Sequence, residues 1–310
     1  MMIEINNLVK RYGDLTALNH LQLSVKKGDV LGLLGPNGCG KTTAINCMLS
    51  LLRFDRGEIK LFGERMAPDR YDLKRRIGVV TQEIAVFEEL TVLDNIDYYC
   101  GLYIDDKNQR QICVADVIKL VGLEDFRKFR PRQLSGGLKR RLNIACGIAH
   151  KPELIFLDEP TVAVDPQSRS RILESIKELN RQGATIVYTT HYMEEVELLC
   201  NQIVIMDQGK VIAEGTKEEL KSMVRDEDKL VVAASGLTPQ QQQVIQQLPG
   251  VVKIDYHAGQ LTLHSSSLEL SLLPLLEYFK EQAIAYAHLH TEEATLNDVF
   301  LAITGKGLRD

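Results

Sequence analysis

Residues 35–43 read Gly-Pro-Asn-Gly-Cys-Gly-Lys-Thr-Thr, and the rest of the chain is interpreted around this stretch. A glycine, four residues and then Gly-Lys-Thr is the spacing of a phosphate-binding loop. Glycines let the backbone turn tightly, so that several N–H groups can point at one phosphate. Apolar residues 30–34 before the loop and a helical pattern after it predict a strand–loop–helix unit, which disfavours a simple glycine-rich turn.

Within this loop, two side chains are expected to meet a triphosphate directly. Lys41 can reach the β- and γ-phosphates, and the hydroxyl of Thr42 can bind Mg²⁺. The motif alone indicates only a nucleotide, since kinases, GTPases and ATPases share it. The residues expected to hold the phosphates are Gly35, Pro36, Asn37, Gly38, Cys39, Gly40, Lys41, Thr42 and Thr43.

Composition places the chain among ordinary globular proteins. It has 310 residues, of which 45% are hydrophobic and 25% charged, a length typical of about two domains. The net charge of −5 gives no sign of a basic face for nucleic acid. Six scattered cysteines without a Cys-x-x-Cys pair favour a reducing compartment and disfavour a zinc site. We expect no membrane-spanning helix and no signal peptide.

Two positions near the loop leave alternatives open. Residues 3–25 alternate like antiparallel strands, and Tyr12 lies on the turn between them, where it could stack on adenine or be a half-buried strand-end aromatic. Gln82 follows a strand-like stretch and could reach a metal, although a lone glutamine is more often a solvated strand end.

A helical segment interrupts the α/β pattern at about residues 88–150. Thr91 begins a helix with an acid three residues later. Ser135 is a second N-cap, and Gly136 and Gly137 after it leave bare backbone N–H groups where an anion could bind. An ordinary capped helix with a flexible start is the alternative.

Acidic and imidazole side chains follow two further strand-like stretches. Asp158 and Glu159 end the apolar run 154–157, where one could serve a metal and the other an attacking water. His191 follows residues 185–190. Because parallel strands present their carboxyl ends at one edge of a sheet, these residues and Gln82 are expected to lie together there.

In this order, the motifs of residues 1 to about 220 resemble the nucleotide-binding subunit of an ABC (ATP-binding cassette) transporter. The resemblance implies an α/β P-loop NTPase core with antiparallel β and helical subdomains. It matches Tyr12 to the adenine-stacking aromatic, residues 35–43 to the phosphate loop, Gln82 to the Mg²⁺-sensing glutamine, residues 134–137 to the signature motif, Asp158 and Glu159 to the Walker B acids, Asp165 to the interface loop and His191 to the switch histidine.

Two positions depart from the family pattern. Leu138 stands where the signature motif usually has glutamine, and many relatives of the drug-export branch also carry an apolar residue there. Ala163 stands where the interface loop commonly has glycine, which could stiffen that loop.

The resemblance also implies a mechanism and partners. ATP and Mg²⁺ would lie between one subunit's phosphate loop and the Ser135-Gly136-Gly137 segment of a second subunit in a head-to-tail dimer. Glu159 would deprotonate the attacking water, His191 would hold the γ-phosphate, and Lys41 would stabilise the transition state. The chain would be bound at the cytoplasmic face of the membrane to a separately encoded permease, with a second ATP-binding subunit forming a homodimer and no nucleic acid involved.

Cys39 carries a separate hypothesis. A thiol in a phosphate loop at a helix N-terminus tends to have a lowered pKa, so maleimide is expected to alkylate it and stop ATP hydrolysis. An inert small residue is the alternative.

The C-terminal part, residues 225–310, is predicted to form a small α+β domain. A charged linker at 225–229 precedes a β-α-β-β-α-β pattern typical of a ferredoxin-like unit, with the last strand at 284–289 and a helix through Pro274. Residues 294–301 are similar to the tail of daunorubicin-resistance-type exporter ATPases.

The leading interpretation is therefore the ATPase motor of an ABC exporter of the drug or lipid type. A soluble ABC ATPase of iron–sulfur assembly or of ribosomes is the runner-up. A small-molecule kinase or GTPase would not explain Ser135-Gly136-Gly137.

Overall fold

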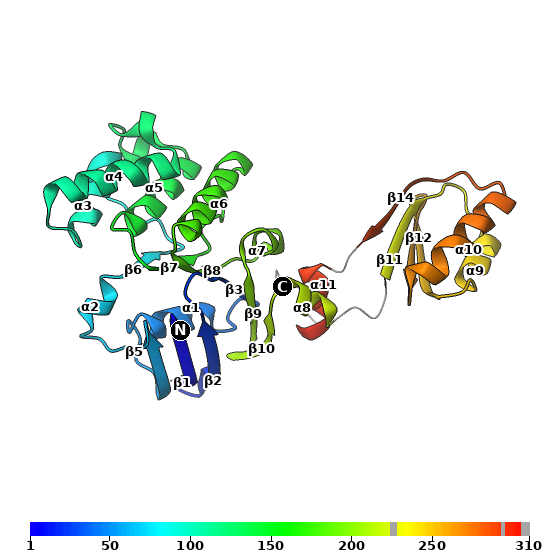
Figure 1. The fold of residues 1–310 in the computed structure, drawn as a ribbon, viewed down its shortest axis with the longest axis horizontal. Coiled ribbons are helices and arrows are strands. Elements are labelled where there is room, and N and C mark those ends of the chain that lie inside the picture. Colours follow the sequence, from blue (N-terminus) through cyan, green and yellow to red (C-terminus); the bar gives the residue numbers. More distant parts are fainter. Residues whose placement is uncertain (224–227, 293–294, 305–310) are drawn as a thin grey trace. The chain divides into compact units, whose positions relative to one another are not determined.

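The computed structural model describes residues 1–223, 228–292 and 295–304 (Figure 1). These residues form two compact units, one covering Met1–Lys217 and the other beginning at Glu218. The domain limits 1–224 and 225–310 stay a sequence-based prediction. In the described ranges, no helix combines the length and the apolar character needed to cross a membrane.

A six-stranded sheet in the order β10-β9-β3-β8-β7-β6 forms the centre of the first unit. Five of its strands are parallel, and only β10 pairs antiparallel, with β9. Every residue of β3 and β8 is buried, as continuous apolar runs predict for parallel strands covered on both faces. The strands are β3 (Val30–Leu34), β6 (Ile77–Val80), β7 (Leu154–Asp158), β8 (Thr185–Thr189), β9 (Gln202–Asp207) and β10 (Lys210–Gly215).

A second, antiparallel sheet in the order β2-β1-β4-β5 belongs to the same unit. Ile3, Ile5 and Leu23 alternate with polar neighbours and pack into the core that the two sheets share. The predicted antiparallel strands flanking the phosphate loop are confirmed. They are β1 (Ile3–Tyr12), β2 (Leu15–Val25), β4 (Arg56–Leu61) and β5 (Glu64–Arg65).

The helices α3, α4 and α5 lie together beside α6 (Figure 1). Thr91 caps α3 with Asp94 in a capping box, as its sequence predicts. The helices of this unit are α1 (Lys41–Met48), α2 (Tyr71–Lys74), α3 (Val92–Gly101), α4 (Lys107–Val121), α5 (Gly136–Ile148), α6 (Pro166–Arg181) and α7 (Met193–Leu199), with short 3-10 turns at Glu124–Phe126 and Pro131–Gln133.

The second unit contains a four-stranded antiparallel sheet in the order β12-β13-β11-β14. With helices after its first and third strands, this is the ferredoxin-like order that the sequence predicts. Its elements are α8 (Lys217–Ser222), β11 (Asp228–Ala233), α9 (Pro239–Gln246), β12 (Val251–His257), β13 (Gln260–Ser265), α10 (Leu268–Glu281), β14 (Ala287–Glu292) and α11 (Leu296–Thr304).

Two local expectations for this unit are wrong. The last strand is Ala287–Glu292 and not 284–289, because the chain turns at Ala283, which has a φ of 51°, before it pairs with β11. Of the predicted linker 225–229, Asp228 and Lys229 already belong to β11, and residues 225–227 lie outside the described residues.

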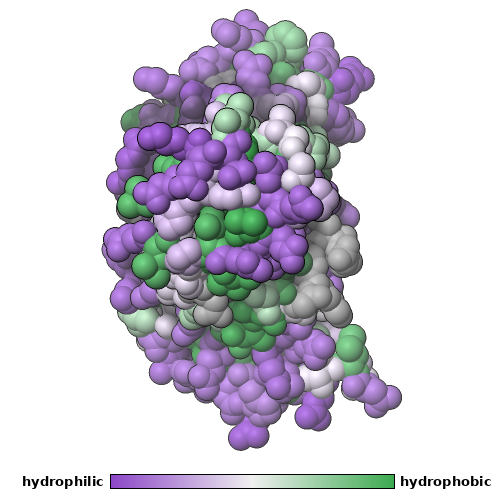
Figure 2. Space-filling model, turned by 90° about the vertical axis from the view of Figure 1, so that its right-hand side faces the viewer, coloured by the Kyte–Doolittle hydropathy of each residue, from purple (hydrophilic) through white to green (hydrophobic). Residues whose placement is uncertain are grey.

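The helix α10 runs through Pro274 and leaves two leucines, Leu270 and Leu273, 57% and 65% exposed. Figure 2 shows one face of the space-filling molecule, on which apolar residues lie among a mostly polar surface.

Candidate active site

The phosphate loop between β3 and α1 has a backbone that only glycine can follow at two points. Gly35 has a φ of 155°, and a Cβ there would lie 2.4 Å from the carbonyl oxygen of Met206. Gly40 has a φ of 109°, and its Cβ would lie 2.6 Å from the carbonyl oxygen of Ala17. The loop is thus pressed against β2 and the end of β9, which fixes its curvature.

Lys41 begins α1 and folds back over the loop. Its Nζ donates hydrogen bonds to the carbonyl oxygens of Gly35 at 2.7 Å and Pro36 at 3.2 Å. The first N–H groups of a helix have no partner within it, so they and this ammonium group converge on one place. A bound phosphate would compete with the two carbonyls for the ammonium group.

A cavity of about 510 Å³ opens over the loop. Side chains from the carboxyl ends of three neighbouring strands enter it: Gln82 after β6, Asp158 and Glu159 at the end of β7, and His191 after β8. The sequence places all four at one sheet edge, and the structure does bring them together. The complete lining is Asn37, Gly38, Gly40, Lys41, Thr42, Thr43, Gln82, Asp158, Glu159, Val162 and His191.

Thr189 organises the two acids and is a residue that the sequence analysis does not single out. Its hydroxyl donates to Asp158 Oδ1 at 2.6 Å and accepts the backbone N–H of Glu159 at 3.0 Å. Glu159 has a φ of 47°, a left-handed conformation that is uncommon outside glycine. The turn sets Glu159 Oε2 3.6 Å from His191 Nδ1. The only sequence signal for this role is that Thr189 ends a buried strand, and the strand pairing then places it opposite Asp158.

The oxygen atoms at the mouth of the cavity suit a magnesium ion. Thr42 Oγ1 lies 3.4 Å from Asp158 Oδ2, and Gln82 lines the same cavity. Nowhere in the described ranges do three His, Cys, Asp or Glu side chains gather as a metal cage. Mg²⁺ commonly takes one or two carboxylates and completes its shell with water and phosphate oxygens, so this sparse donor set fits it.

The segment that carries Gln82 is held by the helix α5, which the sequence analysis also does not anticipate. Arg140 Nη1 donates to the carbonyl oxygens of Gln82 at 2.6 Å and Thr81 at 3.3 Å. Asn143 accepts the N–H of Ala85 at 2.9 Å. Arg140 is buried, and burial lowers the pKa of its guanidinium from the usual range.

The signature segment lies outside the cavity. Ser135 caps α5 by accepting the N–H of Leu138 at 3.3 Å, as predicted. Gly136 is exposed, with open space where a side chain would stand, whereas a Cβ on Gly137 would lie 2.2 Å from the hydroxyl oxygen of Ser168 and 2.6 Å from a carboxylate oxygen of Asp165. The N-terminus of α5 therefore presents an uncovered surface, packed closely from behind.

Asp165 is an N-cap and does not line the cavity. Its carboxylate accepts the N–H of Ser168 at 2.9 Å, and this hydrogen bond lowers the pKa of Asp165. Ala163 has a φ of 57° in the loop before it, a conformation in which glycine is easier to accommodate.

Tyr12 also lies outside the cavity lining. It ends β1 with 48% of its surface exposed, and Lys10 Nζ lies 4.9 Å from the centre of its ring. The exposed ring is accessible to a base, and adenine stacking stays a prediction.

The expectation for Cys39 is wrong. The side chain is 3% exposed beneath the loop, and burial raises the pKa of its thiol. The positive charge of Lys41 acts in the opposite direction but is the smaller influence. Desolvation of the thiolate outweighs the helix N-terminus, so the inert interpretation of this cysteine is favoured.

Comparison with known proteins finds ABC transporter ATP-binding proteins as relatives over the whole length of the chain. The sequence model of the ABC transporter family matches residues 18–162. The chain is 39% identical to the linearmycin resistance ATP-binding protein of Bacillus subtilis, over 100% of both chains. It is 34% identical to a daunorubicin resistance ATP-binding protein of Streptomyces coeruleorubidus, over 99% of this chain and 97% of that one.

A solved structure supports the fold. An ATP-binding cassette captured as a post-hydrolysis dimer bound to ADP and Pi superposes with a TM-score of 0.63 and is 28% identical, covering 69% of this chain and 98% of that one. The geometry of the site and the full-length relatives lead to the same conclusion. This chain belongs to the ABC transporter family as an ATP-binding subunit that hydrolyses ATP.

Proposed function

We propose that this chain is the ATP-hydrolysing motor subunit of an ABC exporter and acts on a separately encoded membrane permease. The observation that carries the proposal is the convergence of Lys41, Glu159 and His191 on one cavity, with the exposed Gly136 segment outside it. Relatives named for drug resistance and for Nod factor export, 34–39% identical to this chain, support the direction of transport.

The residues of the cavity divide the work of hydrolysis. Glu159 orients the attacking water and accepts its proton, and His191 binds the γ-phosphate beside it. Lys41 leaves the carbonyls of Gly35 and Pro36 and stabilises the negative charge of the transferred phosphoryl group. Thr42, Asp158 and Gln82 would hold Mg²⁺, which supplies positive charge to the phosphate oxygens.

The position of the signature segment supports a head-to-tail dimer. Ser135, Gly136 and Gly137 do not line the cavity of their own chain, which supports a role for them toward a nucleotide held by another. ATP would then be an interfacial ligand that stabilises the closed dimer, and its hydrolysis would release it. A homodimer is the simplest assembly, with Asp165 next to the signature segment at the interface.

An aromatic cluster beside Gln82 is the proposed docking surface for the permease. Phe87, Tyr98 and Tyr99 have ring centres 5.0–5.9 Å apart, and Phe87 and Tyr98 are 41% and 49% exposed. Exposed aromatic groups next to a nucleotide-sensing loop can transmit movement to a partner. Binding there would hold the chain at the cytoplasmic face of the membrane.

The test is purification of the tagged chain from detergent-solubilised membranes of its host. We expect a stoichiometric polytopic membrane protein to co-purify with the wild type and to be lost from Tyr98→Glu. Tyr71→Glu changes another tyrosine, 70% exposed on α2, and should keep the partner. Recovery of only soluble partners would remove the exporter proposal and favour a non-transport ABC ATPase.

A further inference from the structure

Glu195 is a buried carboxylate for which the hydrolysis mechanism gives no role. It lies on α7 and is 1% exposed. Its oxygens accept hydrogen bonds from Thr161 Oγ1 at 3.0 Å, Tyr188 OH at 2.7 Å and Thr190 Oγ1 at 2.8 Å. Arg169 Nε donates a fourth, at 2.6 Å. A buried charge with this many donors is well satisfied, and each donor depends on it.

Two of the four donors, Thr161 and Thr190, belong to the segments that carry the catalytic groups. Thr161 follows Glu159 in the loop that leads to Asp165, and Thr190 directly precedes His191. Both threonines are buried, with 2% and 1% of their surface exposed. One carboxylate therefore ties together the segment that holds Glu159 and the segment that holds His191.

Arg169 extends this connection to the histidine ring. Its guanidinium lies over the ring of Tyr192, 4.1 Å from the ring centre, and the rings of Tyr192 and His191 are 4.2 Å apart. Arg169 Nη2 is buried without a hydrogen-bond partner, so the bond from Nε to Glu195 is the main polar anchor of the guanidinium. Arg169 Nη2 also lies 3.9 Å from Oε2 of Glu194, but that side chain is 90% exposed.

We propose that Glu195 is a positioning residue that holds the interface loop 161–165 and the switch segment 190–192 in fixed register, so that Glu159 and His191 meet the γ-phosphate together. The proposal rests on the ATPase mechanism given above. It also links the two sites of a dimer, because movement of the interface loop at Asp165 would be transmitted through Thr161 and Glu195 to His191.

The chemistry of the donors suggests which substitution separates position from packing. Arg169 Nε donates to Oε1 of Glu195, whereas the three hydroxyls all donate to Oε2. In Glu195→Gln, the amide NH2 in place of Oε2 has only two hydrogens for the three hydroxyls, and the guanidinium of Arg169 loses the negative charge it meets at Oε1. The size of the side chain is kept. We expect kcat to fall about 30-fold while KM for ATP stays within about 2-fold, because an interaction needed only for hydrolysis is lost.

Two matched variants accompany this measurement. Glu153→Gln removes the carboxylate of another arginine pair, with Arg76 Nε at 2.7 Å, on the residue before β7 and away from the cavity, and should leave kcat near wild type. The double variant Glu195→Gln, Arg169→Gln places an amide nitrogen where Arg169 Nε stood and should recover part of the lost kcat.

Backbone amide hydrogen exchange, followed by mass spectrometry, measures how firmly segments 161–165 and 190–192 are held, and it does not depend on ATP hydrolysis. In Glu195→Gln we expect faster exchange in both 161–165 and 190–192. Faster exchange confined to α7, an unchanged kcat, or losses of kcat and ATP binding in parallel would each overturn the proposal. A wild-type chain that hydrolyses no ATP would instead count against the proposed function, and the exchange pattern would still decide the role of Glu195.

Discussion

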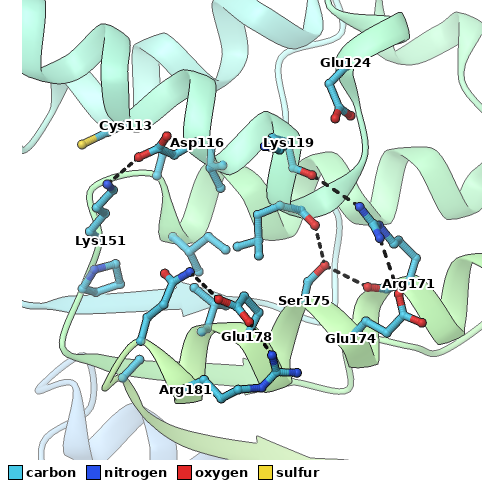
Figure 3. Close-up of a pocket in the computed structure, with 18 residues that line it drawn as sticks. Cys113, Asp116, Lys119, Glu124, Lys151, Arg171, Glu174, Ser175, Glu178 and Arg181 are labelled. Atoms are coloured by element: carbon cyan, nitrogen blue, oxygen red, sulfur yellow. Dashed lines mark hydrogen bonds and ion pairs between the residues drawn. The ribbon is translucent and has the colours of Figure 1, made fainter.

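Two hollows of the first unit differ in the chemistry of the side chains that line them, and the larger one is not the candidate active site. The larger, a groove of about 950 Å³, lies between α4 and α6 at the amino ends of β7 and β8 (Figure 3). The smaller, of about 510 Å³, is the phosphate-loop cavity at the opposite ends of the strands. Chemistry, and not volume, distinguishes a site of catalysis from a surface hollow.

The charges of the groove neutralise one another. Lys151 pairs with Asp116 at 2.6 Å, Arg181 with Glu178 at 2.8 Å and Arg171 with Glu174 at 3.5 Å. Each pair is at least partly exposed, so solvent screens it and it contributes little to stability. The cavity instead combines helix N–H groups, an ammonium, two acids and an imidazole, which can act on a phosphate.

Replacing the acid beside His191 should have the largest effect. We expect Glu159→Gln to lower ATP turnover about 10³-fold because the general base is lost. ATP binding should remain, and the variant should dimerise when ATP is added. Phosphate release and size-exclusion chromatography measure the two outcomes. Glu174→Gln in the groove is the matched control, and a Glu159→Gln enzyme with near-normal turnover would show that Glu159 is not the base.

Arg140 tests whether the Gln82 segment depends on α5. We expect Arg140→Met to reduce turnover roughly 10- to 100-fold and to raise the Mg²⁺ concentration needed for half-maximal activity, because Gln82 loses its anchor. Arg141→Met is the control, since Arg141 donates to the carbonyls of Val121 and Gly122, away from the cavity. Equal Mg²⁺ dependence in both variants would contradict this role.

His150, next to the groove residues Ala149 and Lys151, should make the fold sensitive to acid. Burial lowers its pKa from 6.5 to about 4. Its Nε2–H donates to the carbonyl of Ile77, and its buried Nδ1 has no partner. Protons bind His150 more tightly in the unfolded chain, where its pKa is ordinary, so acid favours unfolding. The stability that depends on a neutral His150 is therefore complete above pH 6.5 and is lost as the pH falls toward 4.

We expect the free energy of unfolding to drop by about 1 kcal/mol between about pH 6.5 and 5.5 from this residue. Urea denaturation at both pH values measures it. In His150→Phe, which can still stack on Tyr103 at the present 3.8 Å separation, the drop should be smaller by that amount. An identical pH dependence in the two proteins would exclude His150 as its source.

The groove itself should respond least. Lys119→Ala combined with Glu124→Ala changes two groove residues that are far from the phosphate loop in the fold, and turnover should stay within about 2-fold of wild type. Steady-state ATPase assays suffice. A loss approaching that of Arg140→Met would mean that the groove takes part in the hydrolytic cycle, like the cavity.

The sequence identified a site residue where the motif around it allows only one type of residue for physical reasons. Gly35, Gly40, Lys41 and the acids at the end of β7 were recognisable because loop curvature, charge and strand-end position each restrict the choice of residue. Thr189, Arg140 and Glu195 were not, since a threonine, an arginine and a glutamate occur in many environments. Their roles depend on partners distant in sequence, such as Gln82 for Arg140 and Thr161 for Glu195.

By itself, the sequence determined the order of the motifs, the strand–loop–helix around residues 35–43, the ferredoxin-like order of the second unit and the family. Only the tertiary structure decided the burial of Cys39, the separation of Ser135–Gly137 from the cavity and the convergence on Glu195. Local motifs fix backbone turns and helix caps through interactions between near neighbours. Burial and hydrogen bonding between distant segments arise only when the sheet brings the ends of its strands together.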